Sequence, residues 1–141
     1  MSLFCTPATY ALAADAQPIT PRSTVDRDYY FELGRKGATD GTSWQPKDDY
    51  SSTYLRVDGR EGTPSRLYVD GARSIGGSGA YNCTIGGSVR APWYTGKYEI
   101  HNNVKEWGYS HARLTAWADI DPGTLRGVWS PDCGGNYTDL N

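Results

Sequence analysis

The residues whose types and spacing could do chemistry lie in two short stretches, EIH at 99–101 and SH at 110–111. Glu99 and His101 are two positions apart, so on a β-strand they would share a face, as an acid–base pair requires. A glycan hydrolase using these two residues is one hypothesis, although it needs a second carboxylate across a cleft. A surface contact between Glu99 and His101 is the simpler explanation. Neighbouring strand residues point to opposite faces, which excludes a direct Ser110–His111 dyad, so we predict no catalytic residue.

A second group of side chains suits binding better than catalysis. Aromatic planes beside forked arginine donors bind sugars or protein surfaces at a low entropic cost. Alternation along the predicted strands places such side chains on outward faces. The candidate ligand-binding residues are Tyr54, Arg56, Arg66, Tyr68, Tyr109, His111, Arg113 and Trp117. Two alternatives stay open: these residues stabilise an exposed sheet as cross-strand pairs, or the faces are inverted and Trp117 lies in the core.

The elements that must position these residues are short strands with alternating apolar and polar residues. Phe31, Leu55 and Leu67 mark the inward faces of three of them, and Leu114 lies on the small apolar face of the stretch GYSHARLTAWA at 108–118. The predicted strands cover residues 28–34, 52–59, 65–71, 81–84, 94–104, 108–118 and 124–133. We expect 52–59 and 65–71 to form a hairpin, because glycines lie between them, and 35–51 to be a long polar loop.

Together these segments predict an all-β fold, a single antiparallel β-sandwich of about seven short strands. A jelly roll is one arrangement that the spacing allows. Gly-Gly pairs at 76–77 and 86–87 fit turns, and a phosphate-binding loop would need a following helix and lysine. The domain is expected to span residues 27–134, with a flexible lead-in at 14–26 and a C-terminal tail at 135–141.

The N-terminus predicts secretion. Ala11-Leu12-Ala13 matches the small-residue pattern of a signal-peptidase site, so residues 1–13 are interpreted as an expression start joined to a signal-peptide remnant. An ordinary alanine-rich segment is the alternative. No apolar run is long enough for a transmembrane segment, and 14 basic against 16 acidic residues give no basic stripe for nucleic acid.

The cysteines fit an oxidising compartment outside the cell. Cys5 would leave with the signal peptide, and we predict that Cys83 and Cys133 form a disulfide across a loop of about 50 residues. Two free thiols are the alternative. The chain lacks a C-x-x-C motif and has two histidines, so a zinc site is not expected. Asp119 and Asp121 offer too few oxygen ligands for calcium and suit a turn, so we expect no metal and no cofactor.

The runs VKEWGYSHARL at 104–114 and GVWSPD at 127–132 resemble small secreted proteins of Gram-positive bacteria. The resemblance implies a signal peptide. The sequence departs from the pattern of those proteins at Cys133, which implies a disulfide particular to this branch. The matching positions are expected to be strand and turn determinants: Gly108, Tyr109, Ser110, Ala112, Leu114, Gly127, Trp129, Ser130, Pro131 and Asp132.

The leading functional hypothesis is a secreted, non-enzymatic binding module whose partner is an extracellular glycan or protein surface. The alternatives are a bacteriocin-like or host-directed antagonist and the hydrolase using Glu99 and His101.

Overall fold

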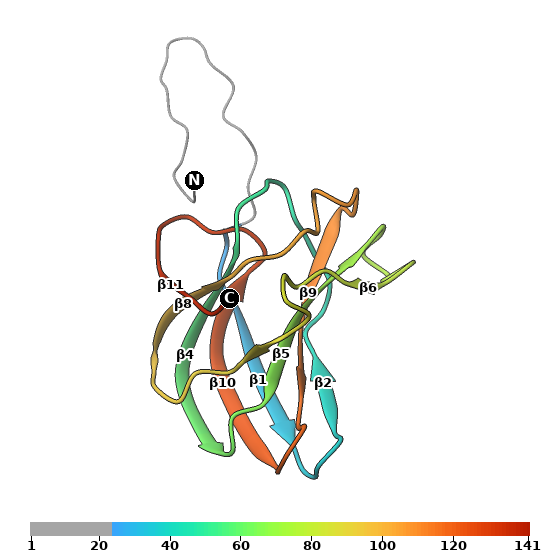
Figure 1. Cartoon of the computed structure of the whole chain (residues 1–141). Coiled ribbons are helices and arrows are strands. Elements are labelled where there is room, and N and C mark those ends of the chain that lie inside the picture. The colour runs from blue at the N-terminus through green and yellow to red at the C-terminus, as the bar shows by residue number, and fades with distance from the viewer. Residues whose placement is uncertain (1–23) are drawn as a thin grey trace.

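The computed structural model describes residues 24–141, which form eleven strands and no helix (Figure 1). The predicted signal-peptide remnant with Cys5, and the lead-in up to residue 23, lie outside the described residues. The strands form two sheets that share one hydrophobic core, which confirms the predicted all-β sandwich. No helix within residues 24–141 is long and apolar enough to cross a membrane.

The first sheet has five strands and is mostly antiparallel. In spatial order it contains β1 (Arg27–Leu33), β10 (Gly123–Ser130), β4 (Thr53–Gly62), β8 (Gly96–Ile100) and β11 (Thr138–Asp139). Only the short β11 pairs parallel to its neighbour among these strands. This strand lies in the segment expected to be a tail, so the C-terminal residues belong to the sheet.

The second sheet is built around two long antiparallel strands, β5 and β9. The expected polar loop 35–51 contributes two short strands to it. Its members are β2 (Thr39–Gly41), β3 (Gln45–Pro46), β5 (Arg66–Ala72), β6 (Tyr81–Asn82), β7 (Val89–Arg90) and β9 (His111–Trp117).

Alternation assigns the core faces of the strands correctly. Phe31 and Leu55 from the first sheet meet Leu67 and Leu114 from the second in one cluster, and each is almost fully buried. Along β9 the small apolar residues are buried and the residues between them are half-buried. The alternative with Trp117 in the core is therefore wrong.

The expected hairpin between 52–59 and 65–71 is not formed. Strand β4 pairs with β10 and β8 in the first sheet, whereas β5 pairs with β9 in the second. The Thr63 amide still donates to the carbonyl of Pro122, next to the β4–β10 pair. The chain then passes to the second sheet at Pro64. Alternation indicates which face of a strand is buried, but it does not indicate which strand lies beside it. The pattern therefore could not distinguish a β4–β5 hairpin from the observed pairing of β4 and β5 in different sheets.

The expected disulfide between Cys83 and Cys133 is also not formed. Cys83 is a buried free thiol in the main core, where burial raises its pKa to about 11. Cys133 lies in a separate small cluster with Tyr54 and Val128. Cys83 packs as a small hydrophobic side chain against Gly71, where a Cβ would lie 2.9 Å from its sulfur.

Candidate functional site

The eight predicted binding residues are divided between the two sheets. Tyr54 and Arg56 belong to β4 in the first sheet. The others lie on or next to the central pair of the second sheet: Arg66 and Tyr68 on β5, His111, Arg113 and Trp117 on β9, and Tyr109 just before β9. The structure therefore places the eight residues on two separate surfaces.

On the outer face of β5 and β9, most of the polar groups bind one another. Arg113 lies over the Trp44 ring at 4.5 Å and donates to Asp70 at 3.2 Å, and the Thr115 hydroxyl donates to the same carboxylate at 2.8 Å. Arg66 faces Trp117 across the strands and donates to the Ser88 hydroxyl at 2.9 Å. This is the cross-strand pairing that stabilises an exposed sheet.

Tyr109 and His111 do not extend that surface. The Tyr109 ring packs against the core beside Gly71, under the Arg73 guanidinium. His111 Nδ1 lies 2.8 Å from Ser110 Oγ, so the excluded serine–histidine contact does exist, because Ser110 precedes the strand and is free of its alternation. The Ser110 hydroxyl donates to the carbonyl of Arg73 at 3.1 Å, whereas a serine nucleophile would direct its hydrogen to the imidazole base.

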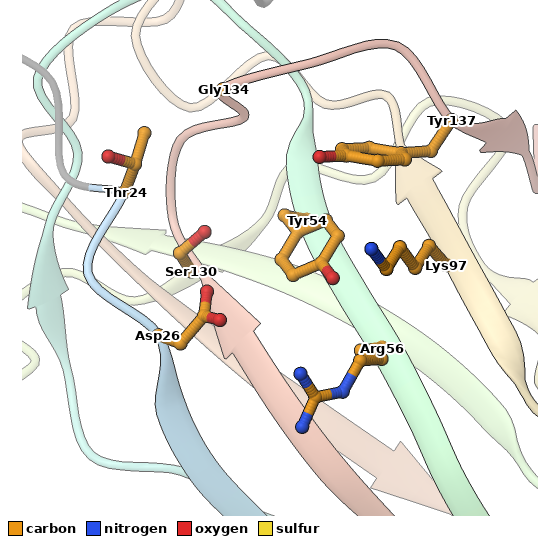
Figure 2. A pocket seen from close by; sticks show the side chains of 8 residues that line it. All are labelled: Thr24, Asp26, Tyr54, Arg56, Lys97, Ser130, Gly134 and Tyr137. Carbon is orange, nitrogen blue, oxygen red and sulfur yellow. The ribbon is translucent and has the colours of Figure 1, made fainter.

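A hollow of about 350 Å³ lies on the outer face of the first sheet (Figure 2). Tyr54 and Arg56 stand on β4, and the register places Lys97 of β8 directly beside Arg56. The C-terminal segment forms one wall and the residues before β1 form another. The lining residues are Thr24, Asp26, Tyr54, Arg56, Lys97, Ser130, Gly134 and Tyr137.

Tyr54 is the centre of this hollow. It points outward from the sheet as predicted, but it is buried because the C-terminal segment covers it, with the Tyr137 ring 4.9 Å away between centroids. Figure 2 shows Lys97 on one side of the Tyr54 ring and Asp26 on the other. Burial, followed by the charge of Asp26, raises the Tyr54 pKa, so its hydroxyl stays neutral and can both donate and accept.

The charges around the hollow are not equally available. Arg56 donates to both carboxylate oxygens of Asp58, at 2.8 and 3.1 Å, and this contact raises the Arg56 pKa and lowers that of Asp58. Lys97 is exposed and makes no ion pair with any residue of 24–141. The ammonium group of Lys97 is therefore free to bind a ligand.

Sequence reasoning missed most of this lining. Asp26 falls in the expected lead-in and Tyr137 in the expected tail, and these segments meet only because β1 and β11 join one sheet. Alternation could have identified Lys97 as an outward residue, since it shares a strand face with Glu99 and His101.

Glu99 and His101 lie at the end of β8 and share a face, as predicted. Glu99 is 7% exposed, and one of its oxygens accepts from the backbone amide of Tyr137 at 2.8 Å. His101 contacts Ser52 Oγ through Nδ1 at 2.8 Å and Asp139 Oδ1 through Nε2 at 2.9 Å. The C-terminal segment thus covers the pair.

A family model described as "Protein of unknown function (DUF2712)" matches residues 12–133. No curated protein and no solved structure matches the chain.

Proposed function

The chain belongs to the DUF2712 family, whose function is unknown, and we propose from its geometry that it is a non-enzymatic binding module for an extracellular glycan. The observation that supports this most strongly is the hollow beside Tyr54. Its lining combines two tyrosine rings, hydroxyl groups, a carboxylate and an unpaired ammonium group.

A sugar unit suits this chemistry because it is polar at its edges and less polar on its C–H faces. Tyr137 offers a ring for such a face, and the Asp26 carboxylate and Lys97 ammonium group offer an acceptor and a donor for hydroxyls. Ligand sites in proteins commonly enclose about 300–1,000 Å³. A hollow of about 350 Å³ fits one terminal sugar unit better than a long chain.

The face of β5 and β9 is the less favoured surface for the same ligand. Its arginines already donate to Asp70 and Ser88, so a ligand would have to break those hydrogen bonds. Action outside the cell is part of the proposal and is supported by the alanine-rich N-terminal pattern and by the resemblance of residues 104–132 to secreted proteins.

A glycan array tests the proposal with variants that separate the two surfaces. Lys97→Ala, an exposed position, is expected to weaken glycan binding at least tenfold without changing the melting temperature. Trp117→Ala, on the other sheet, is the matched control and should bind as tightly as the wild type.

Absence of any glycan ligand at micromolar protein would refute the glycan assignment. Loss of binding in Trp117→Ala with full binding in Lys97→Ala would transfer the site to β5 and β9.

A further inference from the structure

Three potential metal ligands converge where the C-terminal strand joins β8. Glu99 lies on β8, His101 follows that strand, and Asp139 lies on β11. Glu99 and His101 share a face because they are two residues apart, and the parallel register places Asp139 opposite Glu99. One ligand atom from each residue lies within 4.8 Å of the other two.

Glu99 supplies a largely buried carboxylate with one oxygen still available to a ligand. The residue is more than nine-tenths buried, and one oxygen accepts from the Tyr137 amide. The other oxygen accepts no hydrogen bond from residues 24–141 and is not shielded from solvent, so an ion can reach it. Burial of most of the side chain disfavours the negative charge, so a cation bound at this oxygen would compensate that cost.

His101 is held in the orientation that a metal ligand needs. Ser52, itself buried, contacts Nδ1, and this contact turns Nε2 toward the carboxylates. The Asn141 side chain accepts from the His101 amide at 2.8 Å and donates to its carbonyl at 2.9 Å, which fixes the backbone as well. Ligating histidines in metalloproteins are commonly oriented by such a contact through their second nitrogen.

We propose that Glu99, His101 and Asp139 bind a divalent transition-metal ion of the zinc class. One imidazole nitrogen and two carboxylate oxygens are ligands that zinc accepts, and a water molecule would complete a tetrahedral set. The nitrogen ligand favours zinc over calcium, which takes only oxygen ligands. Asp139 is the ligand that can close around the ion, since its side chain is 60% exposed.

The ion would add a further link between β8 and the C-terminal segment. Strand β11 pairs with β8 through two residues only, and the C-terminal segment also supplies Tyr137 to the hollow. Metal binding would therefore stabilise this segment whether or not the hollow binds a glycan.

Zinc titration of the untagged, chelator-treated full chain tests the proposal. Calorimetry should show one zinc ion per chain with a dissociation constant in the micromolar range or below. The melting temperature should rise by several degrees with excess zinc and return to its original value with a chelator, because a ligand that binds only the folded state stabilises it.

Two substitutions test the ligands. Asp139→Asn and His101→Gln should each weaken zinc binding at least tenfold. His111→Gln is the matched control, because it removes the other histidine of the chain and should leave zinc binding unchanged.

Asp139 is exposed, so Asp139→Asn is expected to melt at the wild-type temperature in the absence of zinc, and that measurement separates lost ligation from lost folding. Wild-type zinc affinity in both ligand variants, loss of affinity in His111→Gln, or a melting temperature insensitive to zinc would each overturn the proposal.

Discussion

The ammonium group of Lys47 is a charge placed inside the molecule, and it uses all three of its protons. Nζ donates to Asp132 Oδ1 at 2.8 Å and to the carbonyls of Pro131 and Ser51 at 3.0 and 2.6 Å. Lys47 and Asp132 are both almost completely buried. The hydrogen bonds of Lys47 to Pro131 and Asp132 hold the connection between β2 and β4 against the end of β10. Lysine is rarely buried, so a lysine within a polar stretch such as 35–51 gives no sequence signal for this role.

Replacing Lys47 with methionine should lower the free energy of unfolding by about 3 kcal/mol, because three acceptors lose a buried charged donor. Urea denaturation at neutral pH measures the change. Lys36→Met is the control: Lys36 is exposed in the turn between β1 and β2, and its replacement should stay within about 0.5 kcal/mol of the wild type. Equal stability of the two variants would show that the buried contact contributes nothing.

At the scale of single elements, the sequence predicts faces better than partners. The inward residues Phe31, Leu55 and Leu67 are buried as predicted, because the period of two is a local property. The pairing of β4 with β10 depends on residues about seventy positions apart, and no local pattern encodes it. For the same reason the sequence does not show that the candidate binding residues on β4 and β5 belong to different sheets.

The β4–β10 pair also contains an irregularity that depends on one glycine. The register shifts between Arg126 and Gly127, and the carbonyl of Arg56 accepts from the Tyr29 hydroxyl there at 3.0 Å. A Cβ at Gly127 would lie 1.9 Å from that carbonyl oxygen. Only glycine permits this approach of the two backbones.

Gly127→Ala should therefore force β10 away from β4 and lower the free energy of unfolding by about 3 kcal/mol. Guanidinium unfolding followed by tryptophan fluorescence gives the value. Gly34→Ala is the matched control, since a Cβ at Gly34 meets no atom within 4 Å, and it should leave stability near that of the wild type. If Gly127→Ala also unfolds like the wild type, the close contact between the strands must relax without loss.

At the scale of the whole molecule, composition and alternation were enough to predict a two-sheet sandwich. They could not predict the hollow beside Tyr54. Its walls come from residues before β1, from β4 and β8, and from the C-terminal segment. They meet only after both ends of the described chain have joined the first sheet. Tyr54 illustrates the limit, since its outward direction was predicted and its cover by Tyr137 was not.

The contact between Arg90 and Asp119 lies near the point where the chain passes from the first sheet to the second, and it links distant parts of the second sheet. Arg90 on β7 donates to both oxygens of Asp119, at 2.7 and 2.8 Å, and to the carbonyl of Pro64 at 2.9 Å. Pro64 lies where the chain crosses between the sheets, and Asp119 follows β9. The contact therefore ties that crossing to two elements of the second sheet.

This pair predicts a pH dependence of stability. The hydrogen bond from Arg90 is the main cause that lowers the Asp119 pKa below its usual value. A carboxyl group with a lowered folded-state pKa stabilises the protein above its unfolded pKa of about 4, and this contribution is lost as the pH falls through the folded value.

Asp119→Asn should accordingly lower the free energy of unfolding by about 1 kcal/mol at pH 7, a modest value because Arg90 is partly exposed. The difference from the wild type should narrow steadily below pH 4, as wild-type Asp119 takes up its proton. Urea unfolding at pH 7, 5, 4 and 3 measures this difference, with Asp121→Asn, an exposed neighbour in the same turn, as the control. A difference that stays constant or widens toward acid pH would contradict the assignment, because a contact that depends on the ionised carboxylate must weaken when that carboxylate is protonated.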